Sequence, residues 1–198
     1  MTMHFGARLR KPENELKMTK ENYAGLDNIS SFGKDEIYSE SYCKRLYDNA
    51  IKNYDININR FFSLNKIDFE NILKLYIKEH DQFTEVFDLN KYLGVSGYYI
   101  LVLDEYSQVY IGQTDDIKRR IMNHWSKRMP LDRLIFAGGV ENSILSIDSF
   151  RALDTTRIFA YVTNNNQEYE HRFIMEYPFE YRLNRVYGKI LKERNNKC

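Results

Sequence analysis

The stretch from Gly97 to Thr114 constrains the fold more than any other part of the chain. Residues 98–103 (YYILVL) are an unbroken run of aromatic and aliphatic residues, and residues 108–112 (QVYIG) follow after the polar sequence DEYS. Two such runs joined by a short polar segment predict a β-hairpin. Apolar residues then recur at helical spacing from Ile117, so we expect a helix after the hairpin, capped by Thr114 or Asp115.

The rest of the chain adds helices on both sides and one more strand. Residues 35–54 and 67–80 carry apolar and aromatic side chains at helical spacing. Residues 156–162 predict a third strand, and residues 167–177 predict a helix that Pro178 stops. The pattern therefore predicts an α+β fold, in which helices flank a small three-stranded sheet, mixed or antiparallel, and a helical arm precedes it.

The change from helical to strand patterning near residue 94 predicts a division of the chain. Residues 1–94 would form an N-terminal arm and helical region, and residues 1–33 lack periodicity, so that part should be loosely ordered. Residues 95–198 would form one domain. Within it, residues 126–155 mix Gly, Pro and polar residues and predict an excursion, and the C-terminal segment is basic.

Composition limits the class of protein. With 198 residues, 43% of them hydrophobic, the chain can bury a substantial core. It has no apolar run near the roughly 20 residues that span a bilayer, and no signal-peptide pattern at its start, so we expect a cytoplasmic protein without a membrane partner. Two cysteines, Cys43 and Cys198, indicate neither a disulfide framework nor a cysteine metal site.

Positive charge is concentrated in two places although the net charge is only +1. The usual explanation of such runs is a solvated helix face, so charge alone does not indicate a nucleic-acid partner. The first group comprises Lys118, Arg119, Arg120, Lys127, Arg128 and Arg133, and the second comprises Arg182, Arg185, Lys189, Lys192, Arg194 and Lys197.

The hairpin carries two tripeptides that resemble the motifs of the GIY-YIG nuclease family. Gly97-Tyr98-Tyr99 matches the first motif with tyrosine in place of the usual isoleucine, and Tyr110-Ile111-Gly112 matches the second. Further matches follow in the family's order, and an ordered set is far more specific than one tripeptide. These are a helix arginine and histidine (Arg120 and His124), a metal-binding glutamate (Glu170) and a downstream asparagine (Asn184).

The resemblance implies a metal-dependent endonuclease. Tyr99 would be the general base for the attacking water, with its pKa lowered by a neighbouring charge, and His124 would assist or replace it. Arg120 would bind the scissile phosphate in bidentate fashion, and Tyr110 would hydrogen-bond phosphate or water. Glu170 would hold a single divalent metal, magnesium with manganese as a substitute.

Other polar residues have less specific roles. Asn184, Lys118, Arg119 and Lys127 are predicted to contact substrate, although a turn or a solvated helix face would explain each of them equally well. Glu168 competes with Glu170 as metal ligand, because helical spacing puts the two about 200° apart and only one can face the sheet. The Phe173-Ile174 pair that follows favours Glu170.

A compact chain with an arm and an excursion resembles the stand-alone restriction endonucleases of that family. We therefore expect a type II enzyme that cuts double-stranded DNA as a homodimer, since one site cuts one strand, with a cognate DNA methyltransferase as a possible partner. Homing, repair, structure-specific and RNA-directed nucleases stay open. A non-catalytic nucleic-acid-binding protein also stays open, although such a protein has no need of Glu170.

Overall fold

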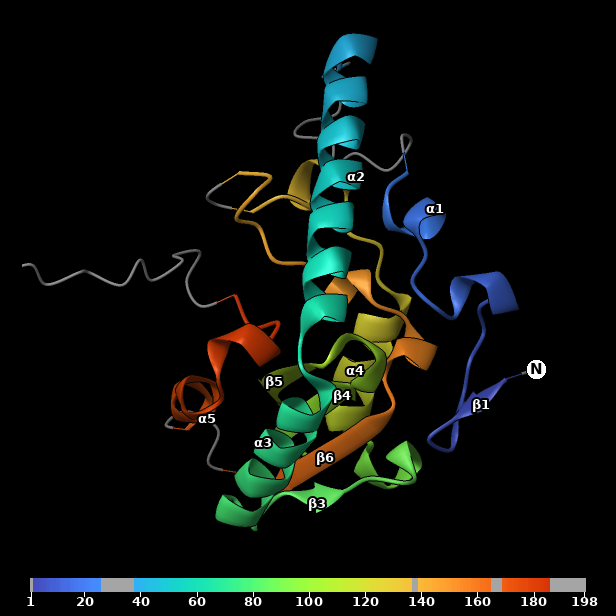
Figure 1. Cartoon of the computed structure of the whole chain (residues 1–198). Helices are drawn as coiled ribbons and strands as arrows, with labels where there is room; N and C mark the ends of the chain where they lie inside the picture. Colours follow the sequence, from blue (N-terminus) through green and yellow to red (C-terminus); the bar gives the residue numbers. More distant parts are fainter. Residues whose placement is uncertain (1, 26–37, 137–138, 165–168, 186–198) are drawn as a thin grey trace, which may run out of the picture.

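The computed structural model describes residues 2–25, 38–136, 139–164 and 169–185. At their centre is a four-stranded antiparallel sheet in the order β3-β6-β4-β5, with helices on both faces (Figure 1). This confirms the α+β class. The sheet has one strand more than expected. The additional strand, β3, is only two residues long, and so short a strand leaves no periodic signal in the sequence. The strands are β3 (Thr84–Glu85), β4 (Gly97–Leu103), β5 (Gln108–Thr114) and β6 (Arg157–Val162).

β4 is the central element of the fold, and all seven of its residues are buried. Alternate side chains of a strand point to opposite faces, so a fully buried strand needs cover on both sides. Odd-numbered residues of β4 pack with α2 and α4, and even-numbered residues pack with α3 and α5. The helices are α1 (Lys20–Tyr23), α2 (Glu40–Ser63), α3 (Lys66–Glu79), α4 (Ile117–Ser126) and α5 (Glu170–Glu176).

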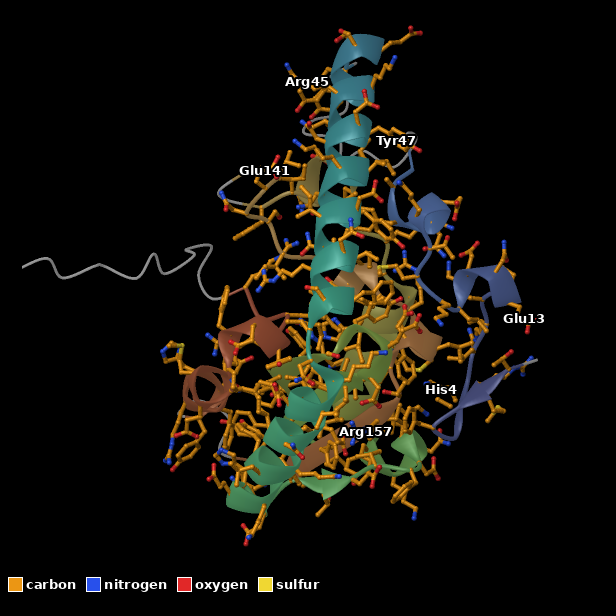
Figure 2. All side chains as sticks on the ribbon, in the orientation of Figure 1. His4, Glu13, Arg45, Tyr47, Glu141 and Arg157 are labelled. Atoms are coloured by element: carbon orange, nitrogen blue, oxygen red, sulfur yellow. The ribbon has the colours of Figure 1, made fainter. Side chains whose placement is uncertain are left out.

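The two long helices predicted before the hairpin are present with shifted ends. α2 continues to Ser63 rather than stopping near residue 54. Its first turns extend beyond the body of the molecule, where Figure 2 shows Arg45, whereas Tyr47 already packs against the core. α4 begins after Asp116, whose side chain accepts a hydrogen bond from the backbone N–H of Arg119 at 2.9 Å. The N-cap of α4 is therefore Asp116 and not Thr114 or Asp115, the two residues predicted from the sequence.

The expectation of a loosely ordered N-terminal arm is wrong for residues 2–25, and residues 26–33 lie outside the described part. This arm forms a small hairpin of β1 (Met3–His4) and β2 (Ala7–Arg8) and then packs on the core through Leu16 and Met18. The buried Asp154 accepts a hydrogen bond from the backbone N–H of Met18 at 2.9 Å. Anchors at isolated positions leave no repeating pattern, which explains why the sequence does not reveal them.

The excursion at residues 126–155 is held between α2 and α4. Its described residues contain short 3₁₀ turns and neither strand nor α-helix beyond the last residue of α4. Two buried asparagines of α2 fix it: Asn53 donates to the carbonyls of Val140 and Ser143, and Asn57 donates to that of Ser143. A buried side-chain amide needs hydrogen-bond partners. The carbonyl groups of the excursion supply them, which explains how two asparagines can lie on the buried face of α2.

Segments from before residue 95 contribute directly to the sheet. β3 pairs with β6, and α2 and α3 cover opposite faces. Within the described ranges, no helix is long and apolar enough to cross a membrane.

The close approach of β4 to β6 requires glycine at position 97. A Cβ there would lie 2.1 Å from the carbonyl oxygen of Tyr161, whereas a Cβ at Gly94, which also has positive φ, would meet nothing within 4 Å. We expect Gly97→Ala to lower the free energy of unfolding by about 2–4 kcal/mol, and Gly94→Ala by only about 1 kcal/mol. Denaturant unfolding of both variants tests this, and equal losses would contradict it.

Candidate active site

The two hairpin motifs meet across β4 and β5. Tyr99 lies opposite Gly112 in the antiparallel register, on the sheet face that α4 covers. A Cβ at Gly112 would lie 2.5 Å from the hydroxyl oxygen of Tyr99 and 2.9 Å from the ring of Tyr110. Glycine at this position therefore lets the strand backbone lie directly on the phenol of Tyr99, which fixes the position of that hydroxyl.

One cavity gathers most of the predicted catalytic residues. It has a volume of about 460 Å³ and is lined by five parts of the chain, namely β5, α4, the excursion, α5 and the segment after α5. Its walls include Tyr110, Arg120, His124 and Glu170. These residues span 61 positions in the sequence, so it is the fold that brings them together.

A chain of hydrogen bonds runs from β4 through α4 to the excursion. The hydroxyl of Tyr99 lies 2.8 Å from Nε2 of His124, and Nδ1 of His124 lies 2.5 Å from Oδ1 of Asp148. Nζ of Lys127 donates to Oδ2 of the same carboxylate at 2.6 Å. Three of these four groups are buried, and only Lys127 is about half exposed, at 52%.

The protonation states of this chain follow from its electrostatics. Burial raises the pKa of Asp148, but its hydrogen bonds with His124 and Lys127 lower it to about 2, so the carboxylate is ionised and can only accept. Burial lowers the pKa of His124 below its usual 6.5, although Asp148 opposes this shift. A neutral His124 must then carry its proton on Nδ1, which leaves Nε2 to accept the hydroxyl proton of Tyr99.

The pKa of Tyr99 moves in the opposite direction to the one expected. Burial, with a smaller contribution from Tyr110, raises the pKa of this phenol well above 10, and the nearby Arg120 only partly opposes the shift. The physical reason is that Tyr99 has no exposed surface, and desolvation disfavours the phenolate more than one neighbouring cation favours it. Free tyrosinate at this position is therefore not available near neutral pH.

Arg120 connects the buried tyrosines to the cavity. Its positive charge acts on both Tyr99 and Tyr110 and opposes the rise of their pKa values, and Arg120 also lines the cavity, whereas Tyr99 itself does not line it. Arg120 is an exposed residue despite these interactions. A fixed, planar cation in this position is suited to an oxyanion that enters from solvent.

Glu170 is the first residue of α5 and faces Arg120 across the cavity. Burial raises the pKa of this carboxyl, while a hydrogen bond from the backbone of Gln113 and the charge of Arg120 oppose the shift. Among the described residues, no group of three or more His, Cys, Asp or Glu side chains is close enough to form a metal cage. One carboxylate in a wet cavity fits magnesium, which keeps several waters, better than zinc, which needs three or four protein ligands.

The predicted substrate-binding residues lie in different places. Asn184 lines the cavity, but its side-chain amide both accepts from and donates to the backbone of Ile111, at 3.0 and 2.7 Å, and so covers the edge of β5. Lys118 bonds the side chain of Asn90 on the other flank of α4, and Arg119 lies 3.9 Å from Asp116. Glu168, the competing metal ligand, lies outside the described residues.

The sequence did not reveal two residues of the site, Asp148 and Arg185. Asp148 belongs to no motif, and its partner His124 is 24 positions away, so only the packed excursion shows the pair. Arg185 was counted as part of a basic segment, but its guanidinium donates to the carbonyls of Leu134 and Ile144 and lines the cavity. The later basic residues of that segment lie outside the described part.

Comparison with known proteins gives no family for this chain: no protein-family model, no curated protein and no solved structure matches it.

The coupling of His124 to Asp148 can be measured by NMR titration. We expect the imidazole of His124 to titrate below pH 6.5 and to stay neutral down to that lowered pKa. As pH falls through it, Nε2 gains a proton and can no longer accept from Tyr99. The unfolded chain binds more protons in this window, so stability rises with pH up to about 6.5.

Asp148→Asn removes a charge that raises the pKa of His124, so the variant should titrate at a still lower pH. His4, whose pKa burial also lowers, bonds the carbonyl of Thr155 and serves as an internal control. An unchanged or higher pKa of His124 in the variant would contradict the assignment of this pair.

Proposed function

We propose that this chain is a metal-dependent endonuclease of the GIY-YIG type that hydrolyses phosphodiester bonds in double-stranded DNA. The observation that carries the proposal is the gathering of Tyr110, Arg120, His124 and Glu170 on one cavity, with Tyr99 hydrogen-bonded to His124 behind its wall. Four separate segments supply these groups. A nucleic-acid-binding protein without catalysis would have no reason to place a single carboxylate beside an arginine and a tyrosine–histidine pair.

Proton removal from the attacking water is assigned to Tyr99 acting through His124. The phenol oxygen accepts a proton from water while its own hydroxyl proton passes to Nε2 of His124, and Asp148 stabilises the imidazolium that forms. Tyrosinate is never formed as a free species, so the raised pKa of Tyr99 is no obstacle.

Arg120 is assigned to the phosphate that is cleaved. Arg120 lines the cavity together with Tyr110, and its exposure leaves it accessible to DNA. Negative charge grows on the phosphoryl oxygens during hydrolysis, and a preorganised bidentate cation stabilises that charge. Tyr110, which also lines the cavity, would hydrogen-bond the same phosphate or the water.

Glu170 would hold a divalent cation, magnesium or manganese, which when bound would neutralise phosphoryl charge and assist the leaving oxygen. Partial burial and the opposing charge of Arg120 keep this carboxylate directed at the cavity rather than at solvent. A cation held by Glu170 would act on the same phosphate as Arg120.

Within this class we favour a type II restriction endonuclease that works in the cytoplasm with a cognate methyltransferase. One cavity cuts one strand, so a double-strand cut needs two copies, and a symmetric dimer on a palindromic site is the natural arrangement. A homing, repair or structure-directed nuclease would use the same cavity chemistry, and the substrate preference in a cleavage assay distinguishes these classes.

The decisive variant replaces the carboxylate at the cavity. We expect the wild-type chain to cut plasmid and phage DNA in magnesium, to stop when the metal is chelated, and to lose at least about 100-fold in rate in Glu170→Gln, because a neutral amide binds magnesium poorly. Glu176→Gln is the matched control. It lies on the same helix, where its carboxylate bonds Arg172 at 2.7 Å away from the cavity, and should leave the rate unchanged.

The fragment ends then identify the kind of nuclease. Discrete bands with one shared end sequence are expected for a restriction enzyme, whereas smearing, or preference for branched DNA or RNA, would indicate the other nuclease classes. Binding of DNA without any cutting in magnesium or manganese would overturn the catalytic proposal.

A further inference from the structure

Three consecutive cationic side chains of α4 point in three different directions. Successive helix residues are rotated by about 100°, so Lys118, Arg119 and Arg120 spread around the exposed half of the helix. Arg120 lines the catalytic cavity on one flank, and Lys118 lines a second cavity on the other flank. The side chain of Arg119 is 69% exposed between them. Cations of α4 therefore lie beside both cavities, and Arg119 lies between them, 3.9 Å from Asp116.

The second cavity lies between the N-terminal arm and α4 and has a volume of about 670 Å³. We call it the arm groove. Arg8, Arg10, Lys11 and Lys118 line it, together with the amides of Asn90 and Asn123, and none of its lining residues is acidic. Lys11 is paired with Glu15 at 3.1 Å, which leaves Arg8, Arg10 and Lys118 as the cations of the groove without a carboxylate partner in the described part of the chain. Three such cations around one groove give a neutral protein an uneven surface field, and such a field attracts polyanions.

Arg8 and Arg10 are arranged to face outward. Ala7 and Leu9 are buried and Arg8 and Arg10 are exposed, so the two arginines lie on the outer side of the arm. Neither arginine forms a salt bridge within the described part of the chain. Arg185 and Arg182, by contrast, are turned inward onto backbone carbonyls.

The size of α4 limits what can contact both cavities at once. A helix with its side chains is about 10–12 Å across, so an inorganic phosphate or a single nucleotide bound at Arg120 cannot reach the far flank. The backbones of a B-form duplex are separated by grooves about 6 and 12 Å wide, which match this distance. A duplex can therefore place phosphates on both flanks of α4.

We propose that the arm groove is a docking surface for the DNA duplex, which binds phosphates outside the cleavage site while Arg120 holds the scissile phosphate. The inference rests on the proposed nuclease function and adds a second contact site to it. Arg8 and Arg10 bind phosphate without reading sequence, so their contribution is affinity and register rather than base recognition.

The test is the salt dependence of duplex binding, measured by fluorescence anisotropy without divalent metal so that no cleavage occurs. Each phosphate contact contributes about 0.9 to the slope of log affinity against log salt concentration. The Arg8→Ala/Arg10→Ala double variant should therefore lower the slope by about 2 and weaken binding roughly tenfold near 0.15 M salt, for any duplex sequence.

The matched control removes the same charge elsewhere. Lys66→Ala/Lys78→Ala alters two exposed lysines of α3, which covers the opposite face of the sheet, and should change the slope little. Thermal unfolding of both double variants confirms that the exposed substitutions preserve the fold.

The outcomes separate the inference from the function that it rests on. If the wild-type chain binds duplex DNA and both double variants bind it equally well, the arm groove is not a DNA surface. If the wild-type chain binds no duplex DNA, the nuclease proposal fails first. A third outcome is that double-stranded RNA displaces the labelled DNA from the wild-type chain better than unlabelled DNA does, and that only the Arg8→Ala/Arg10→Ala variant loses this preference. The groove would then bind RNA, and the inference would be overturned.

Discussion

The hydrogen bonds of His124 with Tyr99 and Asp148 determine how the cavity can work. His124 is buried and its pKa is lowered, so the imidazole is neutral, and the ionised carboxylate of Asp148 fixes its proton on Nδ1. Nε2 must then accept from Tyr99, which aligns the phenol for proton transfer. Two groups that are poor bases alone, a buried tyrosine and a low-pKa histidine, can act together because the proton moves between them without leaving a buried phenolate.

The sheet supplies the rigid frame for this arrangement. β4 is buried on both faces, so the side chain of Tyr99 cannot move without disturbing the core, and the backbone at Gly112 lies directly on its hydroxyl. α4 then adds Arg120 and His124, one turn apart, to the same flank. The site is thus built on regular elements, and the excursion adds Asp148 with its ion-pair partner Lys127.

Local sequence patterns predicted the hairpin and the later helices, because each depends on a short-range rule, whereas the resemblance of the motifs named most of the residues that line the cavity. Alternation, helical spacing and motif order placed Tyr99, Tyr110, Arg120, His124 and Glu170 on their elements. Burial was not predictable in the same way: the direction of the Tyr99 pKa shift depends on how completely the core encloses the phenol. The charge of Arg120 alone suggested the opposite direction.

The packed arm, β3 and Asp148 were missed for a related reason. Each depends on a few contacts between segments far apart in the chain, such as that of Met18 with Asp154 or of His124 with Asp148. Such contacts have no period and no local composition, so one sequence carries no signal for them. Asn184 illustrates the converse, since a motif position places it at the cavity while its amide is engaged by the backbone of β5.

The central claim is that Tyr99 and Asp148 act as one unit through His124, and a double-mutant cycle on the single-turnover cleavage rate tests it. Tyr99→Phe removes the hydroxyl, and Asp148→Asn removes the charge that fixes the histidine proton. We expect each single variant to lose about 100-fold or more, and the double variant to be about as slow as the slower single one, because the relay is already broken. Losses that multiply would show that the two residues act independently and would contradict the account.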